Sequence, residues 1–288
     1  MENQQPETEQ QKRLRASRRV VIKLGTGIVT DGDGQFNAAH LEPVARTIAL
    51  LKKDGRQIVL VSSGAVGLGR GRLGLHRDRL NDMVMRQACA AVGQSLLMHE
   101  YEKLFQTHGV QLAQVLLTEG DFVDRTRYSN LRETMEALLK LGVLPIVNEN
   151  DTVSTAELDS PSGGPEREPD RVRVFGDNDK LSALVMTHID ANLLVLLSDV
   201  DGLYTDDPQS EGATLIPELD SLDESIRGYV RGGNGRGRGG METKLEAVRI
   251  ANEDGRPAII ANGRTPGVLD AILAGQPVGT LFFPRKRQ

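Results

Sequence analysis

The stretch VVIKLGTG at residues 20–27 joins a β-branched run to a glycine-rich turn, with Lys23 at the junction. Near the other end of the chain, GGMETK at residues 239–244 opens an apolar helical pattern that carries Lys244. Glycines let backbone N–H groups approach phosphate oxygens closely, and a lysine supplies a cation for a phosphoryl group. Two such elements suggest that positive charge reaches a transferring phosphoryl group from two sides.

Between these two elements, short β-branched runs alternate with longer helical stretches. This alternation predicts an α/β fold in which parallel strands are joined by crossover helices. The expected strands cover residues 20–23, 57–61, 110–117, 143–147, 172–175, 192–197, 257–261 and 280–283. The expected helices cover residues 41–53, 83–106, 129–141, 178–187, 241–253 and 268–273, the second of them broken near Gly93.

The chain has 288 residues, which is enough for one large core or for two lobes that share a sheet. Residues 1–19 are polar and charged without an apolar core, so they are expected to form a disordered tail and not a secretory signal. A change of character at residues 151–177 suggests the boundary between two halves of one domain. Within it, residues 160–169 are rich in proline, glycine and charge, and are interpreted as an exposed loop.

The composition is that of an ordinary globular protein, with 39% hydrophobic and 26% charged residues and a net charge of -5. This acidic balance argues against nucleic-acid binding as the main function. The tract RGGNGRGRGG at residues 231–240 resembles an RNA-binding segment, but a glycine loop that closes over nucleotide phosphates is the preferred interpretation. No apolar run approaches the roughly 18 residues that span a bilayer.

The remaining special residues are interpreted as structural. Cys89 is the single cysteine and lies in an apolar helical pattern, which indicates a core thiol and fits a reducing compartment. The five histidines lack the spacing of zinc ligands, and no calcium-loop motif occurs. The basic residues 285–287 are interpreted as a solvated end, with a phosphate patch as the alternative.

Polar side chains follow several of the expected strands, at the edge where open α/β sheets bind ligands. Ser63 follows the second strand in SSGAVG, and Asp151 ends the NEND sequence after the fourth. NEND suits an α-ammonium group or a metal-bound water, with capping of a helix as the alternative. Ser198 and Asp199 follow the most apolar strand and suit an adenine or ribose, or else form a plain turn.

The sequence GDNDKL at residues 176–181 places Asn178 and Asp179 at the start of a helix. Asp179 suits pairing with a lysine or with a metal-bound phosphate, whereas Asn178 suits a helix cap. GRGRLG at residues 69–74 matches the dinucleotide pattern but does not directly follow a strand, so a dinucleotide site is rejected. No P-loop motif occurs in the chain.

Six segments, in this order, resemble the amino acid kinase superfamily and, within it, the glutamate 5-kinase branch. They are VVIKLGT (20–26), VSSGAVGLGR (61–70), VLPIVNENDTV (143–153), FGDNDKLSAL (175–184), LLSDVDGLYTDDP (196–208) and GGMETKLEA (239–247). The resemblance implies a three-layer αβα sandwich over residues 20–284, with glutamate bound by the half up to about residue 170 and ATP by the rest. Many relatives continue into a PUA domain, which this form is expected to lack.

The resemblance implies ATP-dependent phosphorylation of the γ-carboxylate of L-glutamate to L-glutamyl 5-phosphate, the first step of proline biosynthesis. It implies that Lys23 and Lys244 stabilise the moving phosphoryl group and that Asp179 organises them. Glutamate contacts are implied for Ser63, Asp151 and Asn178. ATP contacts, with Mg²⁺ carried by ATP, are implied for Lys23, Ser198, Asp199, Arg238, Gly239, Gly240, Met241, Glu242, Thr243 and Lys244.

This chemistry is self-consistent, because a glutamate carboxylate with a pKa of about 4.3 is already ionised at pH 7 and needs no general base. Alignment and neutralisation of phosphate charge remain for the protein to supply. Two alternatives stay open: a kinase for another small carboxylate or carbamate, and a non-catalytic sensor of glutamate, proline or nucleotide. The resemblance further implies a cytoplasmic homo-oligomer, coupled functionally to glutamyl-5-phosphate reductase, with no nucleic-acid or membrane partner.

Overall fold

The computed structural model of the protein describes residues 8–153, 178–219 and 238–284. The predicted strand at 172–175, the loop at 160–169 and most of the boundary at 151–177 lie outside these ranges. Residues 231–237 of the glycine tract and the basic residues 285–287 lie outside them as well.

The strands and helices follow one another along the chain much as the hydrophobic pattern predicts. The strands are β1 (Arg19–Leu24), β2 (Gln57–Ser62), β3 (Leu112–Leu117), β4 (Leu144–Glu149), β5 (Leu193–Ser198), β6 (Glu218–Leu219), β7 (Ala258–Asn262) and β8 (Thr280–Phe282). The helices are α1 (Glu9–Ala16), α2 (Thr26–Val29), α3 (Ala38–Lys53), α4 (Ala65–Arg72), α5 (Met83–Gln106), α6 (Gly120–Val123), α7 (Arg125–Lys140), α8 (Asn178–His188), α10 (Arg238–Glu253) and α11 (Val268–Leu273), with a 3₁₀ helix at Arg77–Asn81.

The strands form one eight-stranded sheet in the order β3-β4-β2-β1-β5-β7-β8-β6. Every pair from β3 to β7 is parallel, and β8 runs antiparallel to β7. Consecutive parallel strands need long crossover connections, which the helices provide. The predicted α/β fold with a largely parallel central sheet is therefore confirmed.

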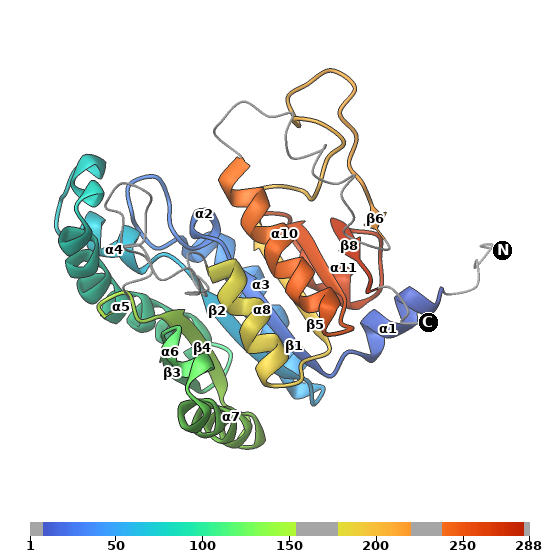
Figure 1. The fold of residues 1–288 in the computed structure, drawn as a ribbon, viewed down its shortest axis with the longest axis horizontal. Helices are drawn as coiled ribbons and strands as arrows, with labels where there is room; N and C mark the ends of the chain where they lie inside the picture. Colours follow the sequence, from blue (N-terminus) through green and yellow to red (C-terminus); the bar gives the residue numbers. More distant parts are fainter. Residues whose placement is uncertain (1–7, 154–177, 220–237, 285–288) are drawn as a thin grey trace, which may run out of the picture.

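The core consists of two clusters, one on each face of this sheet. Along β1, Val20, Ile22 and Leu24 belong to the first cluster and Val21 to the second, because successive side chains of a strand point to opposite faces. Residues of α3, α5 and α11 complete the first cluster, and residues of α7, α8 and α10 complete the second. Figure 1 shows α8 and α10 side by side over one face. Together with the helices of the first cluster over the other face, they give the three layers αβα.

The prediction of a disordered tail over residues 1–19 is wrong for the described part of that segment. Thr8 begins α1 with a capping box, in which its side chain accepts from the backbone N–H of Gln11 and the Gln11 side chain accepts from that of Thr8. Leu14 is buried in the first core cluster, and Arg15 donates to the carbonyl of Ala274 at 2.8 Å. One buried apolar residue, a capping box and a hydrogen bond to the chain after α11 thus accompany the docking of this polar helix.

The predicted break of α5 at Gly93 is also wrong, since the helix is continuous from Met83 to Gln106. A Cβ at Gly93 would lie 1.7 Å from the carbonyl oxygen of Ala65 in α4, and a Cβ at Gly69 would lie 1.8 Å from that of Cys89. These glycines let α4 and α5 approach each other closely. Cys89 is buried at this contact, and burial raises the pKa of its thiol, as expected for a core thiol.

Substitution of Gly93 by Ala should therefore destabilise the protein, because the new methyl group has no space between the two helices. We expect a loss of about 3 kcal/mol or more, and a fall of roughly 10 °C in the midpoint of thermal unfolding. Gly67→Ala is the matched control in α4, since its Cβ would make an ordinary contact of 3.5 Å with Thr30. A midpoint for Gly93→Ala within a degree or two of wild type would contradict this account of the contact.

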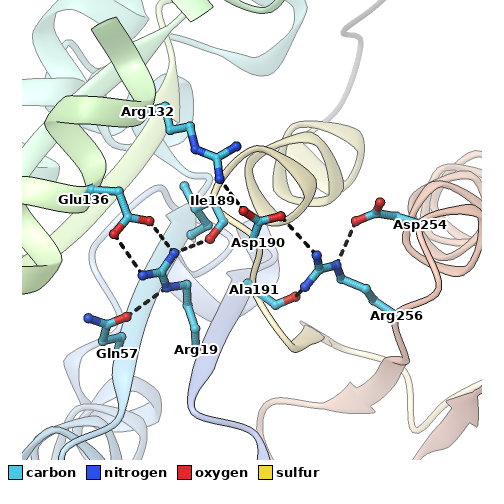
Figure 2. A network of polar contacts seen from close by, with 9 residues as sticks. All are labelled: Arg19, Gln57, Arg132, Glu136, Ile189, Asp190, Ala191, Asp254 and Arg256. Atoms are coloured by element: carbon cyan, nitrogen blue, oxygen red, sulfur yellow. Dashed lines mark hydrogen bonds and ion pairs between the residues drawn. The ribbon is translucent and has the colours of Figure 1, made fainter. Parts of the chain in front are cut away.

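A network of arginines and carboxylates joins several elements near the amino end of β1 (Figure 2). Arg19 forms a bidentate pair with Glu136 of α7, at 2.5 and 3.0 Å, and this hydrogen bonding lowers the pKa of Glu136. Asp190, which follows α8, accepts from both Arg132 and Arg256. The network ties α7, β1 and the start of β7 together.

None of the helices in the described ranges is both long and apolar enough to cross a membrane.

Candidate active site

The predicted site residues gather at the carboxyl edge of the parallel strands. Lys23 lies near the end of β1, Ser63 follows β2, and Ser198 ends β5. In the sheet, β2 and β5 flank β1, so these three side chains lie along one edge, with Asn148 of β4 next to them. The amide of Ser63 donates to the carbonyl of Leu24 at 3.3 Å, which holds the ends of β1 and β2 together.

The lysine–aspartate cluster, formed by Lys23, Asp179 and Lys244, is the most deeply buried charged group of this edge. One carboxylate oxygen of Asp179 lies 2.7 Å from the Lys23 ammonium, and the other lies 3.2 Å from the Lys244 ammonium. The Asp179 side chain is fully buried, and the two lysine side chains are 5% and 10% exposed. Residues that are far apart in the sequence are thus joined by one carboxylate, as predicted for Asp179.

The cluster carries an excess of positive charge. Burial is the largest single influence on the pKa of Asp179 and would raise it, but the charges and hydrogen bonds of Lys23 and Lys244 together hold that pKa below its ordinary value. Asp179 is therefore ionised at neutral pH and cancels the charge of one ammonium group. Within the cluster itself, one carboxylate thus faces two ammonium groups, an arrangement that suits an anion.

Helix α10 holds Lys244 in place through its first turns. The Lys244 ammonium donates to the carbonyl of Gly240 at 2.9 Å, and the Thr243 hydroxyl donates to Asp179 at 3.0 Å. Of the predicted ATP contacts here, Met241 is half-buried and Glu242 is exposed. Arg238 and Gly239 begin the helix, and their side chains lie outside the described residues.

The glycine turn after β1 brings backbone close to the Lys23 ammonium. The N–H of Gly25 donates to the carbonyl of Leu197 at 2.9 Å, and a Cβ at Gly25 would lie only 3.3 Å from that oxygen and 4.0 Å from the Lys23 nitrogen. A side chain at this position would crowd the end of β5, because the turn passes so close to it.

Ser198 and Asp199, which the sequence predicts as ATP contacts, border this turn. The Ser198 hydroxyl donates to Asp199 at 3.2 Å, and a Cβ at Gly27 would lie 3.4 Å from the Asp199 carboxylate. Arg264, after β7, donates to the carbonyl of Gly27 at 3.2 Å. A carboxylate, a guanidinium and a hydroxyl thus surround the turn on the β5 side of Lys23.

On the other side of Lys23, Asn178 is the centre of a set of amide contacts. Its Nδ2 lies 3.1 Å from the carbonyl oxygen of Ser62, 3.0 Å from the hydroxyl of Ser63 and 2.9 Å from Oδ1 of Asn148, so its two hydrogens are shared among three acceptors. Nδ2 of Asn148 in turn donates to Oε1 of Gln94 at 2.8 Å. Asn178 therefore connects α8 to β2 and β4, which goes beyond the helix cap that the sequence also allows.

The structure places Asp151 in the turn that follows β4, three residues beyond Asn148, where it is half-exposed. Ser63, Asn178 and Asp151 thus belong to the β2–β4 part of the edge, and the lysine–aspartate cluster lies next to them. The individual roles of all these residues in binding and catalysis stay predictions.

Gln94 and Arg264 are absent from the residues that the sequence predicts for the site. Arg264 comes two residues after the end of β7, and its place beyond a parallel strand is a signal that could have identified it. Gln94 lies in the middle of α5 and gives only a weak signal, as a polar residue beside Gly93 in a helix with many buried positions. Its approach to Asn148 depends on the close packing of α4 and α5.

Three comparisons relate this chain to known proteins. Residues 18–262 match the model of the amino acid kinase family. The glutamate 5-kinase of Moorella thermoacetica is 46% identical over 285 residues, which cover 98% of this chain and 71% of that protein. The glutamate 5-kinase of Symbiobacterium thermophilum is 47% identical over 272 residues, which cover 94% of this chain and 97% of that protein.

Among solved structures, the UMP kinase from Bacillus anthracis is similar with a TM-score of 0.61. The likeness covers 94% of this chain and 97% of that one, at 20% sequence identity. At this identity it bears on the fold alone.

Proposed function

The chain belongs to the amino acid kinase family, and we propose that it acts as a glutamate 5-kinase, using ATP to phosphorylate the γ-carboxylate of L-glutamate. The product is L-glutamyl 5-phosphate, and the reaction is the first step of proline biosynthesis. Identities of 46% and 47% to two glutamate 5-kinases support this substrate. The observation that carries the proposal is the lysine–aspartate cluster, because two buried ammonium groups held by one carboxylate at a sheet's carboxyl edge suit a phosphoryl group.

In the proposed reaction an oxygen of the γ-carboxylate attacks the γ-phosphorus of ATP. The bond between that phosphorus and the β,γ-bridging oxygen breaks, its electron pair stays on that oxygen, and ADP leaves. The attacking carboxylate is ionised at pH 7, so no proton has to be removed. Lys23 and Lys244 offset the negative charge on the equatorial and leaving oxygens, and Asp179 holds the two ammonium groups in position.

Each of two parts of the carboxyl edge is proposed to bind one of the two substrates. The β2–β4 part, with Ser63, Asn178 and Asp151, is proposed to bind glutamate. The β5 part, with Ser198, Asp199 and residues 238–244, is proposed to bind ATP. This division follows a glutamate half up to about residue 170 and an ATP half beyond it, built on one continuous sheet, except that Asn178 reaches the β2–β4 part from α8.

Mg²⁺ is proposed to enter with ATP and to be held by its phosphate oxygens. Both carboxylate oxygens of Asp179 face lysine ammonium groups, so this buried carboxylate is committed to cations of the chain. The donor set beside it is cationic and suits the phosphates of a metal–nucleotide complex. When bound, the ion would supply additional neutralisation of the phosphate charge.

The product suggests the setting in which the protein works. An acyl phosphate is reactive toward water, so we propose that it is consumed promptly by glutamyl-5-phosphate reductase in the cytoplasm. A homo-oligomer is part of the same proposal and rests on the family alone.

The function is tested by ADP release in a coupled assay with ATP, Mg²⁺ and a panel of acceptors. L-Glutamate should give the highest kcat/KM, ahead of D-glutamate, L-aspartate, N-acetyl-L-glutamate, carbamate and UMP, and hydroxylamine should trap the product as a hydroxamate. A higher kcat/KM for another acceptor would identify a different kinase. Binding of glutamate or nucleotide without ADP release would favour the non-catalytic sensor.

A further inference from the structure

The amide relay, defined here as Gln94, Asn148 and Asn178, has a fixed direction. A backbone carbonyl only accepts, so the Asn178 atom that contacts the carbonyl of Ser62 at 3.1 Å must be Nδ2. The same Nδ2 lies 2.9 Å from Asn148, which must therefore present Oδ1 to it. Nδ2 of Asn148 is then left to donate to Oε1 of Gln94, as it does at 2.8 Å.

This direction leaves one donor and one acceptor at the two ends of the relay. Nε2 of Gln94 and Oδ1 of Asn178 are buried, and neither has a hydrogen-bond partner in the described part of the chain. Buried polar groups are nearly always paired in folded proteins, so an unpaired donor and an unpaired acceptor in one relay require an explanation. A ligand that accepts at one end and donates at the other would provide it.

The relay lies on the side of the site where the amino-acid end of glutamate is expected. Lys23 belongs to β1, whereas Asn148 belongs to β4, two strands away in the sheet. Neighbouring strands are about 4.8 Å apart, so Asn148, the middle residue of the relay, lies roughly one glutamate length from the phosphoryl chemistry, whereas Asn178 directly precedes Asp179. With the γ-carboxylate at the lysine–aspartate cluster, the α-carbon and its two charged groups extend toward β2 and β4.

We propose that Gln94 is a substrate-binding residue whose Nε2 donates a hydrogen bond to the α-carboxylate of the acceptor amino acid. A carboxylate only accepts and an ammonium group only donates, so the two free ends of the relay match the two charges of the amino-acid end. Oδ1 of Asn178 accepts from the α-ammonium group, next to Asp151. This inference rests on the proposed function and extends it to a residue on α5.

The packing of α5 explains why Gln94 can serve in this way. Its neighbour Gly93 has no Cβ, and the carbonyl oxygen of Ala65 occupies the space that a Cβ would take. The backbone at Gln94 is therefore fixed against α4. Asn148 holds the Gln94 side chain from the other direction. A donor held from both sides loses little freedom when it binds a ligand.

Gln94→Glu tests the proposal with a side chain of the same shape. One carboxylate oxygen of the variant still accepts from Asn148, but the other can no longer donate and carries negative charge. The KM for L-glutamate should rise at least 30-fold, with the KM for ATP within about threefold of wild type. L-Glutamate α-amide, which has a donor in place of the α-carboxylate, should be used better by the variant than by wild type, so that the preference between the two acceptors changes at least 100-fold.

Gln106→Glu, an exposed position of the same helix, is the matched control and should leave both KM values unchanged. Equal losses of kcat/KM with L-glutamate and with its α-amide would overturn the binding role of Gln94. A lower midpoint of thermal unfolding without a change in the preference between these two acceptors would overturn it as well. Calorimetric binding of both acceptors, in the presence of a non-hydrolysable ATP analogue, gives the same comparison without turnover. Wild type that binds glutamate but releases no ADP would refute the proposed function, while the change in binding preference would still decide the role of Gln94.

Discussion

Asp179→Asn should cost the protein both stability and activity. The substitution keeps the shape of the side chain but leaves two buried ammonium groups without their counter-charge. Removal of one partner from a buried ion pair typically costs about 3–5 kcal/mol, and here one carboxylate serves two lysines. We expect a loss of free energy of unfolding in that range, measured by chemical denaturation, and a fall in kcat of at least a hundredfold.

The response to nucleotide separates this account from a general packing defect. Phosphate oxygens can replace the missing carboxylate, so ATP should raise the midpoint of thermal unfolding more in Asp179→Asn than in wild type. Glu246→Gln removes one carboxylate from an exposed pair with Arg249 on α10, and its expected cost is below about 1 kcal/mol. Equal stability losses for the two variants, or a nucleotide shift no larger than that of wild type, would contradict the charge balance of the cluster.

The pH dependence follows from the lowered pKa of Asp179. Between its folded and unfolded pKa values the unfolded chain binds the proton and the folded protein does not, so stability rises with pH in that interval. The contribution of Asp179 is complete above the unfolded pKa of about 3.9 and is lost as the pH falls through the lower folded pKa. The stability difference between wild type and Asp179→Asn should thus be constant from pH 8 to about pH 5 and should narrow only in stronger acid.

The sequence predicts the sheet and the charged part of the site because both depend on local patterns. The β-branched runs identify the buried parallel strands, and residues that directly follow such strands must meet at one edge. Lys23, Ser63 and Ser198 are predicted in this way, and Asp179 is predicted from its place in the first turn of a helix, where a carboxylate suits pairing with a lysine.

The features that the sequence does not predict depend on contacts between distant segments. Gly93 resembles a helix break, and only the packing of α4 on α5 shows that a methyl group would collide there. The segment over α1 resembles a disordered tail, because a single buried residue, Leu14, gives too weak a pattern. Gln94 joins the site only through its contact with Asn148, which no local pattern contains.

Lys244→Met should lower kcat by about a hundredfold while the KM for ATP changes much less. Methionine keeps most of the apolar stem and removes the charge that lies 3.2 Å from Asp179. Negative charge spreads over the equatorial oxygens as the phosphoryl group moves, so a cation placed there binds the transition state more strongly than ground-state ATP. The expected loss of about 3 kcal/mol in activation free energy is that of one stabilising donor removed from such a site.

Two control variants show whether charge at this position is the cause. Lys103→Met removes an exposed lysine of α5 and should leave kcat unchanged. Lys244→Arg keeps the charge but brings a larger, planar group into a nearly buried place, so it should recover part of the activity and not all of it. If Lys244→Met instead raises the KM for ATP and keeps a near-normal kcat, Lys244 is an anchor for ground-state phosphate. The lysine–aspartate cluster would then act through Lys23 alone, because a cation that binds ATP and transition state equally gives no acceleration of the chemical step.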